Sequence, residues 1–515
     1  MYSLSYCAAI RGIEGCMIQV EADISDGLPC FSLVGFLSSE VKEARERVQI
    51  AMKNAGFRFP PKKVTINLSP ADIRKGGTGY DLAIAVSILT AFGYFSQEFI
   101  KNIVFIGELS LEGKIREVHG VLPMVYTAYE YGMKYCVVPK ENLSEAKIVR
   151  GITCIGVSDL KELTDMLQNQ KLVEQVMPKE AAFEKEAATL DFCDVNGQKL
   201  VRRAIEVSVA GMHNLLMVGP PGSGKTMLAK RIPGIMPELT FEEQMEISKI
   251  YSVAGLLSKK LPFISKRPFR EPHHTITQKA LIGGGILPKP GEISLASGGV
   301  LFLDELAEFQ RQTIEVLRQP LEDGYVTVSR MDGTYCYPAH VQLVAAMNPC
   351  RCGFYPDRKK CSCTSGQIRS YIHKISQPML ERMDICVETI PLAYQDFHKS
   401  GIRQGNECSE DIRKRIVAAQ KQQNERYQKE AIFHNSQLTP YLVGKYCILT
   451  AEAEEYLKNA FEKLEFSARV YHKVLKVGRT IADLAGEERI QQKHIAEAIC
   501  YRMLDKKYWG SEEDF

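Results

Sequence analysis

The sequence lacks three features that would narrow its class at once: an excess of one charge, a long apolar run and a disulfide framework. Its 65 Lys and Arg face 62 Asp and Glu, so the net charge of +3 gives no overall sign of a nucleic-acid binder. The longest uncharged apolar stretch, residues 82–95, is shorter than the roughly 20 residues that span a bilayer. We expect it to form a buried helix, in a protein that makes no contact with a membrane.

Neither the amino-terminal residues nor the cysteines suggest export. Residues 1–10 have no basic start, and Arg11 and Glu14 interrupt the apolar residues that follow. The 15 cysteines are odd in number and are therefore expected to be free thiols, with any tight cluster reserved for metal. We therefore predict a cytoplasmic protein. The apolar fraction of 45% and charged fraction of 25% are ordinary for a globular chain and exclude a disordered or fibrous one.

The length of 515 residues predicts about three domains of roughly 150 residues each. The first segment mixes strand and helix patterns, the second is polar enough to be a linker, the third has the alternation of a parallel-sheet domain, and the fourth is helical in spacing. The expected segments are 1–165, 166–190, 191–390 and 391–515. In the first segment we expect strands at 12–20, 64–68, 104–107 and 135–138, and a helix at 40–55.

The strongest motif fits the phosphate-binding pattern G-x-x-x-x-G-K-[ST] without mismatch. It lies between an apolar run at 215–218 and a stretch at 227–231 that suits a helix. Its glycines allow backbone N–H groups to curl around phosphate oxygens. Lys225 is expected to reach the β- and γ-phosphates of ATP, and Thr226 to bind Mg²⁺. The motif consists of Gly219, Pro220, Pro221, Gly222, Ser223, Gly224, Lys225 and Thr226.

Two further apolar runs end in polar residues suited to nucleotide hydrolysis. The run at 299–303 precedes Asp304, expected to hold Mg²⁺, and Glu305, expected to act as the general base. The run at 342–347 precedes Asn348, an amide that could orient the attacking water. Alternatively, the acids cap the helix that follows and the asparagine starts a turn. Their order after the phosphate loop favours the functional interpretation.

Four cysteines form two C-x-C pairs within a short segment: Cys350 with Cys352, and Cys361 with Cys363. Four thiolates can hold Zn²⁺ tetrahedrally and leave no open position for catalysis. We therefore predict a structural zinc site. The alternative is a loop with unpaired thiols.

The near-neutral total conceals two basic segments. Residues 259–289 hold seven Lys or Arg against one acid, and residues 351–382 hold seven against two. Hairpins are expected around residues 283–290 and at 326–337, where Asp-Gly favours a tight turn. Lys289 and Arg330 are candidates for sequence-independent phosphate contacts in a pore. The alternative is a solvated charged face. His273 and His274 could be pore residues, but core packing or a helix start fits them as well.

The phosphate loop, the acid pair and Asn348, in that order, resemble an AAA+ ATPase. More specific runs resemble the magnesium-chelatase-like ATPases of the ComM/YifB group, and the resemblance covers nearly the whole chain. These runs are Arg267-Pro-Phe-Arg270-Glu-Pro-His273-His274, Gly283-Gly-Gly, Pro290-Gly-Glu-Ile-Ser-Leu-Ala296, Asn67-Leu-Ser-Pro-Ala-Asp72, Lys75-Gly-Gly, Ser467-Ala-Arg469 and Leu475-Lys-Val-Gly-Arg479. The implied fold is α/β: a Lon-protease-like α+β domain, an AAA+ core with a parallel sheet, and a helical lid.

The resemblance implies two further site residues and an assembly. Arg382 lies in the segment that looks like the arginine-finger segment and is expected to reach the γ-phosphate of a neighbouring subunit. Arg469 looks like the lid arginine that senses nucleotide in its own subunit. The alternative for either is a surface salt bridge. An arginine supplied between subunits requires a ring, and the resemblance implies a homo-hexamer.

The amino-terminal segment resembles the Lon-protease-like domain, but the Ser–Lys dyad of Lon is missing. When the motifs are aligned, Gly79 takes the serine position and Leu122 the lysine position, and neither side chain can act as nucleophile or base. Ser69, Ser87 and Lys75 are nearby, so a shifted dyad stays open. We expect a non-proteolytic scaffold or binding surface.

These observations lead to three hypotheses. The first is a hexameric ATP-dependent motor on single-stranded or branched DNA, with branch migration during recombination in natural transformation implied by the resemblance, and recombination proteins as candidate partners. The second is a chelatase-like or chaperone-like ATPase that remodels a protein partner. The third is a Lon-type peptidase, against which the missing dyad argues.

Overall fold

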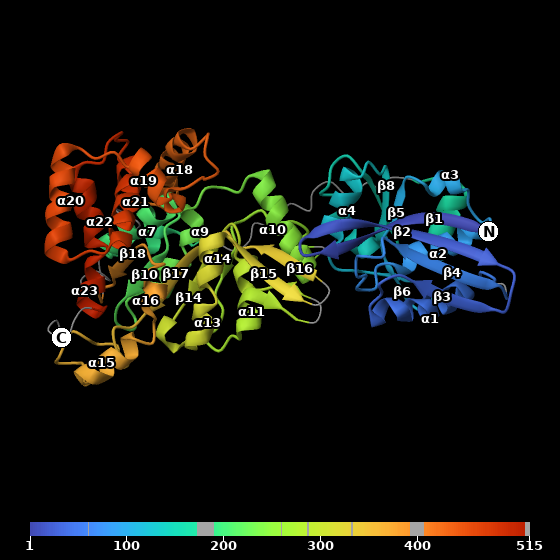
Figure 1. Ribbon diagram of the computed structural model, residues 1–515, viewed down its shortest axis with the longest axis horizontal. Coiled ribbons are helices and arrows are strands. Elements are labelled where there is room, and N and C mark those ends of the chain that lie inside the picture. The colour runs from blue at the N-terminus through green and yellow to red at the C-terminus, as the bar shows by residue number, and fades with distance from the viewer. Residues whose placement is uncertain are drawn as a thin grey trace.

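The structure, a computed structural model, describes residues 1–59, 61–172, 190–258, 260–285, 288–330, 333–391 and 406–509. Figure 1 shows an elongated molecule, with one α/β unit at the amino-terminal end, a second in the middle and a group of helices at the other end. In the described part of the chain, no helix is both long and apolar enough to cross a membrane. Most of the expected linker, residues 173–189, lies outside the described residues.

The amino-terminal unit is built on a seven-stranded sheet in the order β3-β4-β2-β1-β5-β8-β9. The pairs β1–β2 and β2–β4 are antiparallel and the other neighbours are parallel. The strands are β1 (Tyr2–Arg11), β2 (Glu14–Ser25), β3 (Cys30–Val34), β4 (Lys63–Ser69), β5 (Ile103–Phe105), β8 (Tyr135–Pro139) and β9 (Thr153–Val157), with a separate pair β6 (Glu108–Leu109) and β7 (Ile115–Arg116). The helices are α1 (Ser39–Asn54), α2 (Asp81–Ala91), α3 (Gln97–Ile100), α4 (Val121–Glu130), α5 (Leu143–Ala146) and α6 (Leu160–Gln168).

One expected strand in this unit is misplaced. The strand predicted at 12–20 starts at Glu14 and is preceded by a strand that was not predicted, because Gly12, with φ of 69°, turns the chain between β1 and β2. The buried helix expected within 82–95 is confirmed as α2, all of whose residues are buried. Its polar Ser87 donates to the carbonyl of Val20 at 2.9 Å, so burial leaves that hydroxyl paired.

The middle unit contains a five-stranded parallel sheet in the order β11-β14-β17-β10-β18. Its strands are β11 (Phe269–Arg270), β14 (Val300–Leu303), β17 (Gln342–Met347), β10 (Leu215–Val218) and β18 (Ile385–Glu388). Every residue of β10, β14 and β17 is buried, as in a sheet covered on both faces. Because the strands are parallel, their carboxyl ends share one edge, where ligands bind in open α/β sheets.

Short helices and two hairpins complete this unit. The helices are α7 (Lys199–Gly211), α8 (Lys225–Ala229), α9 (Ile232–Ile235), α10 (Phe241–Ala254), α11 (Gln278–Ile282), α12 (Glu292–Leu295), α13 (Arg311–Glu315), α14 (Arg318–Asp323), α15 (Ser365–Ile372) and α16 (Gln377–Leu380). The hairpins pair β12 (Gly283–Gly284) with β13 (Lys289–Pro290), and β15 (Tyr325–Arg330) with β16 (Gly333–Pro338). Both hairpins lie where the sequence predicted them, although Met331 and Asp332 of the second turn lie outside the described residues.

Helix α10 joins the two α/β units (Figure 1). Lys249 on α10 contacts the carboxylate of Glu14 at 2.9 Å. Ser252, one turn on, donates to the buried carboxylate of Glu145. Ile13, from the β1–β2 turn, packs in the same apolar cluster as the hairpin β15–β16. The amino-terminal unit therefore touches both α10 and this hairpin.

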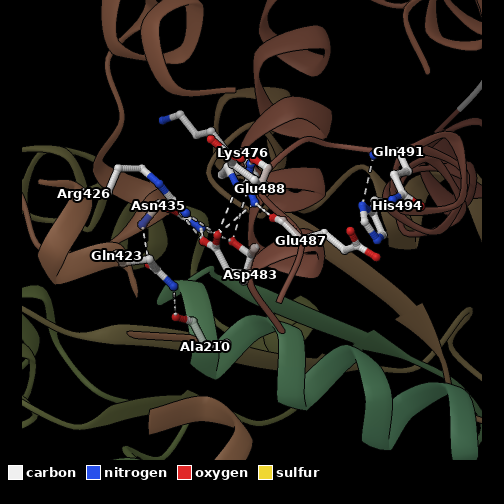
Figure 2. A network of polar contacts seen from close by, with 12 residues as sticks. Ala210, Gln423, Arg426, Asn435, Lys476, Asp483, Glu487, Glu488, Gln491 and His494 are labelled. Carbon is white, nitrogen blue, oxygen red and sulfur yellow. Dashed lines mark hydrogen bonds and ion pairs between the residues drawn. The ribbon is translucent and has the colours of Figure 1, made fainter. Parts of the chain in front are cut away.

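The described residues after 406 form helices, which are α18 (Ser409–Arg426), α19 (Pro440–Tyr446), α20 (Ala451–Leu464), α21 (Ala468–Leu484), α22 (Gln492–Cys500) and α23 (Met503–Trp509). A buried polar network fixes them (Figure 2). Asp483 on α21 accepts from Arg426 Nη1 at 3.0 Å, from Arg479 Nε at 3.1 Å and from Asn435 Nδ2 at 2.9 Å. Gln423 continues the network to the carbonyl of Ala210 on α7, so it also ties these helices to the middle unit.

Candidate nucleotide site

The predicted phosphate loop links the end of β10 to the start of α8. Gly222 and Gly224 have φ of 74° and 85°, conformations that L side chains rarely adopt. A Cβ on Gly219 would collide with Thr389 at the end of β18, so this position also requires glycine. Ser223 Oγ lies 2.7 Å from Thr389 Oγ1, which holds the loop to the neighbouring strand.

Lys225 is folded onto its own loop. Its Nζ donates to the carbonyls of Gly219 at 2.8 Å and Pro220 at 2.9 Å, and to Oδ1 of Asn348 at 3.2 Å. Burial lowers the pKa of Lys225 to about 8, and the nearby carboxylates of Asp304 and Glu305 oppose that shift. The structure thus brings Asn348, predicted from a separate strand, to the predicted phosphate-binding lysine.

The acid pair lies beside the loop. Thr226 Oγ1 donates to Oδ2 of Asp304 at 2.6 Å, so a hydroxyl and a carboxylate converge on one point, as hard cations such as Mg²⁺ require. Glu305 has φ of 51°, in the left-handed region that a glutamate occupies only where its surroundings hold it. Its carboxylate is largely exposed and lies 4.0 Å from His274 Nδ1.

Arg382 follows α16 at the edge of the middle unit. Its guanidinium forms an ion pair with Glu322 on α14 and donates to the carbonyl of Pro378 at 3.1 Å. Its side chain is only 15% exposed. Two residues on, Asp384 forms an ion pair with Lys473 of α21, with 3.2 Å between Oδ1 and Nζ. Burial acts to raise the pKa of Asp384, but the positive charges of Lys473 and Lys476 and the contact with His213 together outweigh it and hold the pKa below its ordinary value.

Arg469, the predicted lid arginine, lies near the start of α21 and is exposed. It contacts Glu381, the residue immediately before Arg382. The segment that carries Arg382 is therefore in contact with the start of α21. The predicted nucleotide-sensing role of Arg469 stays a prediction.

The four predicted zinc ligands converge. The Sγ atoms of Cys350, Cys352, Cys361 and Cys363 all lie within 4.8 Å of one another. The Sγ of Cys350 lies 3.3 Å from that of Cys352 and 3.8 Å from that of Cys361. Four sulfur atoms gathered in this way fit a tetrahedral zinc ion. The cluster starts two residues after Asn348, at the same edge of the sheet.

The two candidate DNA contacts lie on adjoining hairpins. Lys289 on β13 and Arg330 on β15 are both exposed. Arg330 Nε donates to the carbonyl of Gly285 at 3.1 Å, which joins one hairpin to the other. Of the basic segments, Lys259 lies outside the described residues. Arg270, in contrast, is bound at 2.6 Å and 2.8 Å by Glu292 and is not free for a ligand.

Comparison with known proteins covers nearly the whole chain. Three family models match: magnesium chelatase subunit ChlI at residues 191–397, subunit ChlI of Mg-chelatase at 20–142, and the ChlI carboxyl-terminal model at 406–502. Competence protein ComM of Haemophilus influenzae is 39% identical over 507 residues, which are 98% of this chain and 97% of that protein. The uncharacterized protein YifB of Escherichia coli is 39% identical over 504 residues, with the same coverage.

The chain belongs to the ComM/YifB group of magnesium-chelatase-like proteins. Its middle unit is accordingly an AAA+ ATPase unit of the chelatase type, which binds ATP and Mg²⁺. The mixed α/β fold with a parallel sheet, expected from the sequence, is confirmed.

The amino-terminal unit also has a distant similarity to Lon. Lon protease 2 of Herpetosiphon aurantiacus is 24% identical over 161 residues, which are 29% of this chain and 20% of that protein. At the two dyad positions, Gly79 accepts a hydrogen bond from the Cys7 thiol at 3.6 Å, and Leu122 is fully buried in an apolar cluster. Of the residues left open for a shifted dyad, Lys75 is buried and donates to the Pro70 carbonyl, and Ser87 donates to the carbonyl of Val20.

Sequence reasoning missed three neighbours in this ATPase of the chelatase family. His274, left open between a pore role, core packing and a helix start, lies beside Glu305; Thr389 holds the phosphate loop; and Glu322 holds Arg382. The first two follow from strand order, because β11 lies next to β14 and β18 next to β10. A sequence pattern does not give that order. No pattern in the sequence singled out Glu322.

Proposed function

We propose that the chain is a hexameric ATP-driven DNA motor, and that it promotes branch migration in the recombination of single-stranded DNA during natural transformation. The observation that carries the ATPase is the convergence of Lys225, Thr226, Asp304 and Asn348 at one edge of the parallel sheet. The DNA role rests on the full-length similarity to a protein named for competence and on the paired basic hairpins.

The site residues have distinct tasks in this proposal. Lys225 exchanges its loop carbonyls for the β- and γ-phosphates, and Thr226 with Asp304 holds Mg²⁺. Glu305 takes the proton of the attacking water, and Asn348 orients that water. Arg382 of one subunit stabilises the charge that develops at the neighbouring subunit's γ-phosphate, where a planar guanidinium binds two oxygens at once. Arg469 senses the bound nucleotide.

The hairpins supply the DNA surface. Lys289 and Arg330 contact phosphates without reading bases, so affinity does not depend on sequence and falls as salt rises. Residues 1–165 form the scaffold, 191–390 the motor and 391–515 the lid in this proposal. The cysteine cluster binds Zn²⁺ and stiffens the segment between Asn348 and Arg382. Its sulfur-only donor set suits a structural ion.

A second function, that of a chelatase-like or chaperone-like ATPase acting on a protein partner, is favoured by one observation. The family models that match are those of magnesium chelatase, whose name describes work on a metal rather than on DNA. The hydrolysis site is the same for both functions. They differ only in the molecule on which the ATPase acts, which is DNA in the first and a protein in the second.

The test is the rate of ATP hydrolysis with and without forked or single-stranded DNA, at low and moderate salt. We expect DNA to stimulate hydrolysis, and stimulation to fade with salt for every sequence alike. If DNA does not stimulate ATP hydrolysis at low salt, and if a protein partner copurifies stably with the chain, the second function would be favoured.

A further inference from the structure

The proposed arginine finger does not project from the surface in this chain. Arg382 Nη2 is paired with Glu322, Nη1 donates to Pro378, and Nε is buried with no partner among the described residues. Only 15% of the side chain is exposed, against 59% for Glu322. An arginine that serves a neighbouring subunit must leave this position.

The backbone beneath Arg382 is held independently of the guanidinium. Its carbonyl accepts from Asn214 Nδ2 at 3.0 Å. The next carbonyl, of Met383, accepts from Lys473 and from Arg502, each at 2.6 Å. Release of the side chain therefore needs no change in this backbone, only a change of partner at its tip.

The partner lies at the foot of the proposed DNA-binding hairpin. Glu322 occupies the last turn of α14, which ends at Asp323; Gly324 follows with φ of 75°, and β15 begins at Tyr325. Arg330 at the far end of β15 is a proposed phosphate contact. A tilt of the hairpin would thus move the turn that carries Glu322. Because Glu322 is more than half exposed, water and salt screen the ion pair, and a small movement suffices to break it.

We propose that Glu322 holds Arg382 away from the neighbouring subunit, and that movement of the hairpin β15–β16 on DNA releases it to that subunit's phosphates. This rests on the proposed function, in which Arg382 is the finger and the hairpin touches DNA. Glu322 is a positioning residue, since it acts through Arg382 and not on the nucleotide. The device makes hydrolysis in one subunit depend on DNA held by the next.

The first test is Glu322→Gln, which keeps the shape and removes the charge. If the finger of the wild type is free for about a tenth to a third of the time without DNA, the variant raises the basal rate of hydrolysis by about 3- to 10-fold. The rate with saturating DNA and the KM for ATP stay unchanged. Glu322→Asp, which keeps the charge, should restore a low basal rate. The matched control is Glu315→Gln on α13, whose carboxylate pairs with Arg318 at 3.1 Å.

The second test asks whether the effect crosses between subunits. Wild-type protein is mixed with an excess of Lys225→Ala or of Lys225→Ala/Glu322→Gln, neither of which can hydrolyse ATP itself. We expect more hydrolysis per wild-type subunit with the double variant, because its finger is free for its neighbour. A structural role of Glu322 would not produce this difference.

Wild-type basal rates in Glu322→Gln, an equal loss of basal and stimulated rates, or equal hydrolysis in the two mixtures would each overturn the inference. If the proposed function itself is wrong, the results differ from these. In that case Arg382→Ala leaves ATP hydrolysis intact, or DNA does not stimulate hydrolysis by any variant. Unfolding temperatures of all variants are compared first, and Glu322→Ala, which also removes the carboxylate, takes the place of Glu322→Gln if that variant folds poorly.

Discussion

The two α/β units are both built on a central sheet, but they differ in how their polar side chains are paired. In the amino-terminal unit, the dyad positions of Lon are occupied by Gly79 and by the buried Leu122. Its buried Asp81 is bound by Arg47 at 2.9 Å. In the ATPase unit, the polar groups Lys225 and Asp304 lie at the open edge of the sheet, on neighbouring segments. Asp81 is thus paired within its own unit, whereas Lys225 and Asp304 lie where a ligand can replace their partners.

Glu305 is the proposed general base of the ATPase unit, and its replacement is expected to have a large effect on hydrolysis. Glu305→Gln should bind ATP but lose hydrolysis by about 100-fold or more, because the amide cannot accept the proton of water. Nucleotide binding and phosphate release are measured side by side. Glu308→Gln, which removes a nearby carboxylate paired with Lys374, is the control and should keep its activity. Normal turnover in Glu305→Gln would refute the assigned base.

The buried polar network around Asp483 is expected to stabilise the folded chain. Asp483→Asn leaves Arg426 and Arg479 without their shared carboxylate and should lower the free energy of unfolding by about 3–5 kcal/mol. Chemical denaturation provides the measurement. Asp411→Asn on α18 removes an exposed partner of Lys414 and should cost about 1 kcal/mol or less. Equal losses in the two variants would show that the network contributes nothing special.

Metal removal tests the cysteine cluster. We expect the purified protein to carry one zinc ion per chain, and a strong chelator to lower its unfolding temperature by several degrees, since bound metal stabilises only the folded state. Cys350→Ser should reproduce that loss, whereas Cys336→Ser, at an exposed cysteine outside the cluster, should not. A protein without zinc and indifferent to chelators would rule out the metal site.

The Lon-like unit is expected to show no peptidase activity, even when a serine is restored at the Gly79 position. Gly79→Ser fits the space available, since a Cβ there lies 4.0 Å from Ile106. It should fold normally and still cleave no casein, because Leu122 offers no base to activate a hydroxyl. The wild type should be equally inert, with an active Lon protease as the positive control. ATP-dependent cleavage by either form would restore the peptidase hypothesis.

Local patterns were predictable from the sequence, and long-range pairs were not. The phosphate loop, Asp304, Glu305 and the cysteines were found because each motif lies within a few consecutive residues or at one strand end. The contacts of His274 with Glu305 and of Glu322 with Arg382 depend on strand order and on packing between helices. The strand predicted at 12–20 was misplaced because the chain turns at Gly12, so that the strand begins only at Glu14.

Strand displacement on a three-stranded branched DNA with ATP and Mg²⁺ tests whether this ATPase is a DNA motor. We expect that the wild type displaces the third strand, that Glu305→Gln does not, and that displacement is independent of sequence. A wild type that hydrolyses ATP yet displaces no strand from any branched substrate would contradict the proposed DNA motor.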